Sequence, residues 1–240
     1  MYLEIGTLLI ITHMFYVCKG LNDIRMVYNG TLCGLNLDLW APHLGLPIFQ
    51  HNIRALLPGY SQCDVEVGEM FLNSPLHPDL RPFTRVDIMH IKSRPDKEGW
   101  DQDRTRVWER WAKNFMGLTE SPYRSLQLLI CVKFIAYGER KNPLNPFHLS
   151  HARLNLPADE SYTHIFPWVL KMRSYGNLAS EVFIYVYDSH IIAHSDLVYW
   201  QAVKIFFSTF NSLGIQEASR KRIEPSLTPV PWAGNNGAHV

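Results

Sequence analysis

The sequence lacks an excess of charge of either sign, and it has few cysteines. Its 23 Lys and Arg residues nearly balance 22 Asp and Glu residues, so the net charge of +1 gives no general basic signal for nucleic acid. A nucleic-acid groove would need local clustering of the basic side chains. The four cysteines form no CxxC pair and are too sparse for a secreted disulfide framework. We therefore expect free thiols and an intracellular location, either cytoplasmic or nuclear.

Internal repeats, low-complexity segments and long hydrophobic runs are also absent from the sequence. The apolar stretch GTLLIITHMFYV at residues 6–17 follows Glu4, has no basic region before it and is interrupted by His13. These features argue against a signal peptide, and the stretch is too short and too polar to span a membrane as a helix. We expect a buried strand that leads into Lys19, and no membrane partner.

The chain does contain enough apolar residues, 47% of 240, to fill the core of one large domain or of two coupled subdomains. Stretches rich in proline and charge predict loops at 93–106, 138–146 and 156–161, with a helix from about Thr105 through Trp111. A longer helix is predicted from Pro122 to Tyr137. Its apolar stripe, which should pack on a sheet, consists of Leu126, Leu129, Ile130, Phe134 and Tyr137.

A β-hairpin is predicted near residue 188. The β-branched and aromatic run VFIYVY, Val182 to Tyr187, is typical of a strand. A tight turn at Asp188-Ser189 and a second strand, HIIAH, follow it. Strands mixed with helices indicate an α+β domain with antiparallel pairing at the hairpin.

Two acidic residues alternate along another predicted strand, within CDVEVGEMFLNSPL. Asp64 lies two residues before Glu66, so both side chains point to the same face of an extended strand. Carboxylate oxygens on one face are suited to binding Mg²⁺. The alternative is the ordinary exposed acidic face of an edge strand.

The order of several short motifs resembles a reverse transcriptase of a retroelement. Its fingers, successive palm motifs and primer grip are matched by DIRMVYNGTLCGLN, EVGEMFLNSPLHPD, MGLTESP, FIYVYDSHIIAHS and PWAG. The resemblance covers roughly Met14 to Gly234. It implies a right-hand polymerase palm, with an antiparallel sheet backed by helices, and a partial fingers subdomain. The segments would be 1–62 (fingers-like), 63–216 (palm, with an inserted loop near 138–161) and 217–240 (end of the palm and primer grip).

The resemblance also implies catalytic and metal-binding residues. Polymerases of this kind use two Mg²⁺ ions about 3.5 to 4 Å apart to clamp the attacking and leaving oxygens. Glu66 matches the Asp of the first palm motif, with Asp64 as a second candidate ligand. Asp188 matches the last Asp of the Tyr-x-Asp-Asp signature, in which Tyr187 replaces the first Asp. A phenol with a pKa near 10 is a poor Mg²⁺ ligand, so activity should be weak or lost.

Other motif residues would bind the substrates. Lys19 and Arg25 would hold the triphosphate of a dNTP, and Phe71 would exclude a ribose 2′-OH. Met116 and Gly117 would lie against the base pair. The remaining candidates are Lys221, for the leaving group, and Trp232, Ala233 and Gly234, for the primer grip. The alternatives are a solvated surface pair for Lys19 and Arg25, a core position for Phe71, and a charged turn and a surface Trp near the chain end.

Three functional hypotheses stay open. The first is a reverse transcriptase by descent, with an RNA or DNA template-primer and dNTPs as partners and Mg²⁺ as cofactor. The second is a nucleic-acid-binding or assembly module that keeps the palm without its chemistry. The third is an unrelated α+β domain whose motif matches are accidental. Carboxylates of Asp64, Glu66 and Asp188 that converge in the structure would favour a palm.

Overall fold

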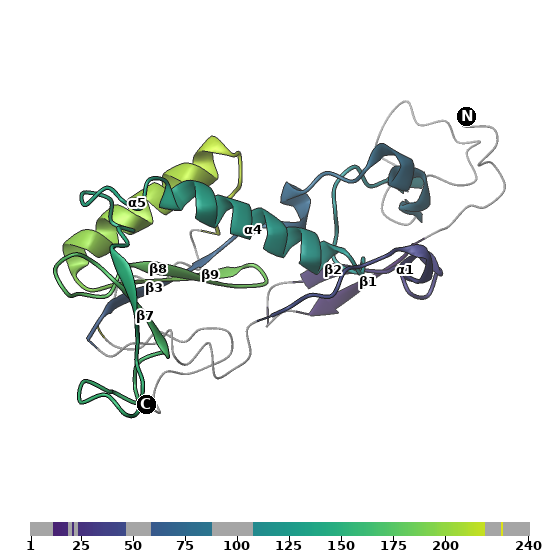
Figure 1. The fold of residues 1–240 in the computed structure, drawn as a ribbon. Coiled ribbons are helices and arrows are strands. Elements are labelled where there is room, and N and C mark those ends of the chain that lie inside the picture. The colour runs from purple at the N-terminus through teal and green to yellow at the C-terminus, as the bar shows by residue number, and fades with distance from the viewer. Residues whose placement is uncertain are drawn as a thin grey trace, which may run out of the picture. The chain divides into compact units, whose positions relative to one another are not determined.

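The computed structural model describes residues 12–18, 21, 24–46, 59–87, 108–218 and 227 (Figure 1). The chain divides into two compact units, each assembled from two stretches of sequence. The first comprises Met1–His43 and Phe71–Arg124, and the second comprises Leu44–Met70 and Ser125–Val240. Long-range packing, rather than simple succession along the chain, therefore builds each unit.

The first unit contains short strands and turns around a small core. Strands β1 (His13–Cys18) and β2 (Ile24–Asn29) form an antiparallel hairpin, and β4 (Arg85–Asp87) pairs with β5 (Trp108–Arg110). Helix α1 (Leu35–Asp38) and the 3-10 helices η1 (Met70–Asn73) and η2 (Pro78–Phe83) connect these strands. The buried residues that form the core are Tyr28, Leu35, Leu76, Val86, Phe115 and Leu118.

Two predictions for this unit are wrong. Strand β1 is largely exposed rather than buried, because it belongs to a two-stranded ribbon instead of a covered sheet. The helix expected to end at Trp111 is replaced over Trp108–Arg110 by strand β5, since pairing with β4 outweighs the local preference of three residues. Residues 105–107, where that helix was to begin, lie outside the described residues.

The second unit is built on a three-stranded antiparallel sheet. Its order is β3 (Ser61–Glu66), β9 (Asp188–Ala193) and β8 (Glu181–Tyr185), so β9 lies in the centre. The strand that carries Asp64 and Glu66 thus pairs directly with the second strand of the hairpin. The last turns of helix α4 (Ser121–Tyr137) and helix α5 (Asp196–Ser212) cover one face of this sheet (Figure 1). Ser195 caps α5 by accepting a hydrogen bond from the Val198 backbone N–H.

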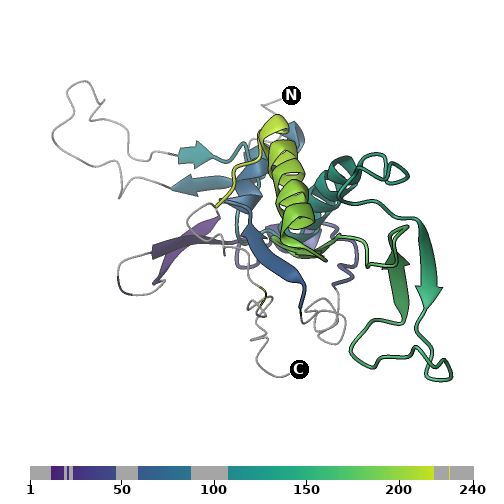
Figure 2. The ribbon, with the colours of Figure 1, turned by 90° about the vertical axis from the view of Figure 1, so that its left-hand side faces the viewer.

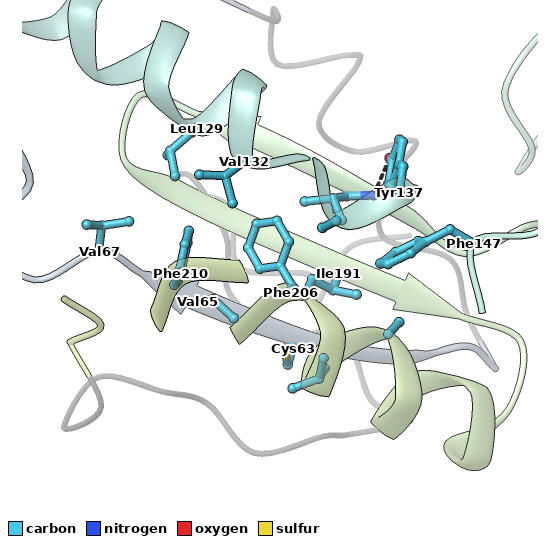
Figure 3. Packing of buried hydrophobic residues seen from close by; sticks show 14 of the residues in the cluster. Cys63, Val65, Val67, Leu129, Val132, Tyr137, Phe147, Ile191, Phe206 and Phe210 are labelled. Carbon is cyan, nitrogen blue, oxygen red and sulfur yellow. Dashed lines mark hydrogen bonds between the residues drawn. The ribbon is translucent and has the colours of Figure 1, made fainter. Parts of the chain in front are cut away.

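The main core lies between the sheet and these two helices. Alternate residues of β3, Cys63 and Val65, point toward the helices with Ile191 of β9 (Figure 3). Phe206 and Phe210 of α5 pack against these residues, and the centroids of the two phenyl rings lie 4.9 Å from each other. The residues that alternate with Cys63, Val65 and Ile191 on these strands point to the opposite face of the sheet.

Helix α4 confirms the predicted helix and part of its predicted stripe, since Leu129 and Tyr137 are buried in the core. Ile130 and Phe134 are 37% and 68% exposed, whereas Leu129, Val132 and Ala136 are buried against the sheet. The buried set also follows helical spacing, and its smaller side chains allow a closer approach to the strands.

A segment between α4 and β8 forms a ribbon of its own. Strands β6 (His151–Leu154) and β7 (Val169–Met172) pair antiparallel (Figure 2). Leu170 and Met172 pack with Leu178 and with Ile192 of β9, so β7 meets the sheet on the face opposite the two helices. The predicted loop at 138–146 precedes β6 and that at 156–161 lies between β6 and β7, and both are confirmed. Within the described residues, no helix is long and apolar enough to cross a membrane.

Candidate functional site

Three carboxylates share one face at one end of the β3–β9 pair. Glu66 lies directly opposite Asp188 in the antiparallel register, and Asp64 lies opposite His190. Directly opposed residues point to the same face, as do residues two apart on one strand. Val65 and Ile191, on the other face, belong to the helix-covered core. The structure thus places Asp64, Glu66 and Asp188 on the same face of the sheet in the second unit.

The hairpin turn lies two residues earlier than predicted. Tyr185 pairs with Asp188, so Val186 and Tyr187 form the turn and Asp188 begins β9. Val186 has a φ of 56°, in the left-handed region that a two-residue hairpin loop requires. The prediction of a turn at Asp188-Ser189 failed because Val at such a position gives no turn signal in the sequence.

Tyr187, which replaces the expected Asp, packs against the core. Its partly buried ring contacts the cluster beneath the helices, and its backbone carbonyl accepts a hydrogen bond from Val67 N–H at 3.4 Å. The ring therefore contributes to packing on the side of the sheet away from Asp64.

Asp64 has an unusual electrostatic environment. Burial penalises its charged form, and the negative charges of Asp188 and Glu66 add to that effect, which together raise the pKa of Asp64 to about 7. Its Oδ1 atom is buried and has no hydrogen-bond partner. A cation bound at this face would relieve both the repulsion and the missing contact.

His190 supplies no such positive charge, although it is the cross-strand neighbour of Asp64. The ring is fully buried, and burial lowers the pKa of His190 to about 3, so the imidazole is neutral at pH 7. Its Nε2 atom lies 3.3 Å from Gln62 Oε1. We did not predict this neighbour, but strand alternation after Asp188 indicates it.

The residues fit a Mg²⁺ ion only in part. Carboxylate oxygens are the donors that Mg²⁺ prefers, and the ion often takes only one or two protein carboxylates plus water and substrate phosphates. Yet in the part of the chain that the structure describes, no three His, Cys, Asp or Glu side chains are grouped so as to hold a metal ion. Any bound ion must therefore take ligands from water or substrate.

Met116 and Gly117, the residues of the second palm motif expected to lie against the base pair, belong to the first unit. Gly117 has a φ of 115°, and a β-carbon added to it would lie 1.7 Å from the Tyr28 carbonyl oxygen. Tyr28 N–H donates to the Met116 carbonyl at 3.2 Å. The close approach that Gly117 permits is thus to the backbone of β2.

Asn36, a residue that the sequence-based prediction missed, fixes the same loop. Its Nδ2 donates to the Gly117 carbonyl at 2.9 Å, and its Oδ1 accepts from Thr119 N–H at 3.0 Å. Its position in the Gly-Leu-Asn run of the fingers motif could have indicated this role, since the side-chain amide of Asn can form hydrogen bonds with two backbone groups at once.

The other predicted substrate residues are distributed as follows. Arg25 is exposed on β2, opposite Val17, and Phe71 is half-buried in η1 of the first unit. The remaining candidates lie outside the described residues: Lys19, Lys221, Trp232, Ala233 and Gly234.

Comparison with solved structures indicates a similar fold. The foamy viral protease-reverse transcriptase in complex with double-stranded DNA matches with a TM-score of 0.55 and 12% sequence identity, over 92% of this chain and 27% of that chain. The chain therefore spans about a quarter of the length of that protein. No protein-family profile matches the sequence, and no curated protein matches it. The mixed helical and antiparallel-sheet fold is thus like that of a reverse transcriptase.

Proposed function

We propose that the chain is a reverse-transcriptase-like domain of a retroelement that binds a nucleic-acid template-primer, with DNA synthesis from dNTPs weak or lost. The observation that carries the proposal is the set of three carboxylates, Asp64, Glu66 and Asp188, on one face of the sheet. A fold similar to that of a reverse transcriptase supports the same assignment. We assign the face to a palm, with the β1–β2 hairpin as part of the fingers.

The carboxylates would act by holding and neutralising Mg²⁺. One or two of the carboxylates of Asp64, Glu66 and Asp188 would hold the ion, with water and substrate phosphates as its other ligands, and the ion when bound supports in-line displacement at the nucleotide phosphorus. Asp64 would have to lose its proton first, because a carboxyl with a pKa of about 7 is half protonated at neutral pH. The affinity for the ion should therefore rise with pH.

Two sequence changes account for the expected loss of synthesis. Tyr187 offers no carboxylate, and its ring packs on the core instead. Glu66 is one methylene longer than Asp, and small misplacements in such a site cost about a hundredfold in rate. The absence of a three-ligand metal group among the described residues also favours the second function, a nucleic-acid-binding module without catalysis.

Primer extension with Mg²⁺ on RNA and DNA templates tests the proposal. The full chain should extend a primer little, and Tyr187→Asp combined with Glu66→Asp should recover measurable extension. The matched control, Tyr187→Asn with Glu66→Asp, loses the same core contact without gaining a carboxylate and should stay inactive. Thermal melting of each variant shows whether the loss of the Tyr187 ring unfolds the sheet.

Either of two results would contradict the proposal. Robust extension by the unmodified chain would mean that Asp64 and Asp188 suffice and that the roles of Tyr187 and Glu66 are wrong. A chain that binds neither template-primer nor single strands in a fluorescence anisotropy titration would exclude both the polymerase and the binding module.

A further inference from the structure

A buried carboxylate surrounded by three cations lies at the start of β8, at the end of that strand away from Asp188. Glu181 is only 6% exposed. Its Oε1 atom lies 3.3 Å from Lys133 Nζ, and its Oε2 atom lies 4.0 Å from Arg140 Nη2 and also pairs with Lys171 Nζ. Three positive charges thus meet one negative charge.

The negative charge of Glu181 is fully engaged. Oε1 also accepts a hydrogen bond from the Tyr137 hydroxyl, so each carboxylate oxygen already contacts two partners. Among the described residues, no second carboxylate pairs with Lys133, Arg140 or Lys171. Arg140 Nε also donates a hydrogen bond to the Phe147 carbonyl at 2.8 Å, which adds no negative charge. Glu181 thus offsets only one of the three positive charges, in a chain whose total net charge is only +1.

The three cations are held close to one another. The Arg140 guanidinium lies 4.4 Å from the centre of the Tyr137 ring, and Lys133 Nζ lies 5.3 Å from the same centre. Burial, and then repulsion from Lys133 and Arg140, lower the pKa of Lys171 to about 8. The repulsion of Lys171 by Lys133 and Arg140 indicates that positive charge exceeds negative charge around Glu181.

This group of cations can be reached from solvent. The side chains of Lys133 and Arg140 are 23% and 20% exposed, and that of Lys171 is 46% exposed. A phosphate group carries one or two negative charges and several acceptor oxygens, which suits an ammonium beside a guanidinium. Carboxylate ligands offer fewer acceptor oxygens for three cations.

Exposed aromatic residues in the same segment of the chain indicate a nucleic acid as the source of the phosphate. Arg140 and Lys171 belong to the segment that carries the β6–β7 ribbon, and this segment also exposes the rings of Tyr162, Trp168 and Tyr175. Basic side chains together with exposed aromatic rings are the features with which proteins bind single strands.

We propose that Lys133, Arg140 and Lys171 form a binding site for a backbone phosphate of single-stranded nucleic acid. The choice of nucleic acid as ligand rests on the proposed function, whereas the site itself rests on the arrangement of charges around Glu181. The site is separate from the carboxylates of Asp64 and Asp188 and adds a contact to the second unit beyond the palm face.

Fluorescence anisotropy with a short labelled single-stranded oligonucleotide tests the site. Lys171→Gln should weaken binding about tenfold and lower the salt dependence by the equivalent of one phosphate contact, a slope change of about 0.7. The control Lys204→Gln removes the same charge from an exposed position of α5 and should have little effect. Equal affinities for the Lys171→Gln and Lys204→Gln proteins would overturn the proposal.

Two further variants separate binding from folding. Lys171→Arg keeps the charge and should retain most of the affinity, and Lys133→Gln should weaken binding as Lys171→Gln does. A Lys171→Arg protein that folds normally, by circular dichroism, yet binds as poorly as Lys171→Gln would contradict a phosphate site.

Inorganic pyrophosphate distinguishes a site for the backbone phosphate of a nucleic acid from a site for free phosphate compounds. It should compete with the oligonucleotide in the unmodified chain and not in Lys171→Gln. If Lys171→Gln weakens the binding of pyrophosphate but leaves the affinity for the oligonucleotide unchanged, the nucleic-acid assignment is wrong. These outcomes do not depend on Asp64, Glu66 or Asp188, so an inactive polymerase site would leave them unchanged.

Discussion

Gly117 and Tyr28 approach each other so closely that a β-carbon at residue 117 would lie 1.7 Å from the Tyr28 carbonyl oxygen. Gly117→Ala should therefore lower the free energy of unfolding by about 3 kcal/mol or more, because the backbone of β2 must move and the φ of 115° is strained for any other residue. Urea denaturation measures the change.

The matched control for Gly117 is Gly34→Ala in the same unit. Gly34 also has a positive φ, 82°, but nothing lies within 4 Å of an added β-carbon. This substitution should cost only about 1 kcal/mol. Equal costs at the two positions would show that strain in φ, rather than contact with Tyr28, decides the effect.

Asn36→Ala should destabilise the first unit by about 2 kcal/mol, because it removes the hydrogen bonds to Gly117 O and Thr119 N–H. Asn36→Asp keeps the acceptor for Thr119 but faces the Gly117 carbonyl with an oxygen, so it should cost a similar amount. Chemical denaturation of both variants checks this. Stability unchanged in Asn36→Ala would mean that the loop is fixed by other contacts.

Asp64 should make the protein less stable as the pH rises. Its pKa is raised from 3.8 to about 7 in the folded state, so the folded chain binds more protons than the unfolded chain between these values. The free energy of unfolding should therefore fall across this window, by about 2 kcal/mol after allowance for solvent screening.

Asp64→Asn should remove that dependence and stabilise the protein at pH 8. Unfolding curves at pH 5 and pH 8 provide the comparison, with Asp159→Asn, at an exposed loop position, as the control. Parallel pH profiles for the unmodified chain and Asp64→Asn would exclude Asp64 as the titrating group.

Glu181→Gln should lower the free energy of unfolding by about 3 kcal/mol, because breaking buried ion pairs leaves Lys133, Arg140 and Lys171 repelling one another. The control Glu139→Gln removes a carboxylate from an exposed position nearby and should change stability by less than about 0.5 kcal/mol. Thermal melts at low and high salt measure both variants, and high salt should reduce the cost at Glu181.

The acidic face was predictable from the sequence because strand alternation has a fixed period of two. Asp64 and Glu66 could be assigned to one face without knowledge of their partners, and the apolar hairpin gave them a neighbouring strand. The turn could not be located, since Val186 adopts a positive φ that its residue type disfavours.

Long-range contacts explain the remaining differences between the sequence-based predictions and the structure. Trp108–Arg110 became a strand through pairing with Arg85–Asp87, which lies far away in the sequence. Contact with the sheet determines which residues of α4 are buried: Val132 and Ala136 are buried in the core, whereas the larger Phe134 is exposed. The positions of Asn36 and Glu181 depend on partners in other segments, so residue type alone could not reveal their contacts.

The Tyr137 hydroxyl joins the last residue of α4 to the beginning of β8. It contacts Glu181 and accepts a hydrogen bond from Val182 N–H at 3.0 Å, so the two ends of the segment that carries the β6–β7 ribbon meet at one point. A segment closed at its base can change in length at little entropic cost, because loop closure depends only weakly on length. The loops of this segment are thus places where the chain can gain sequence while β7 keeps its contacts with Ile192 of β9.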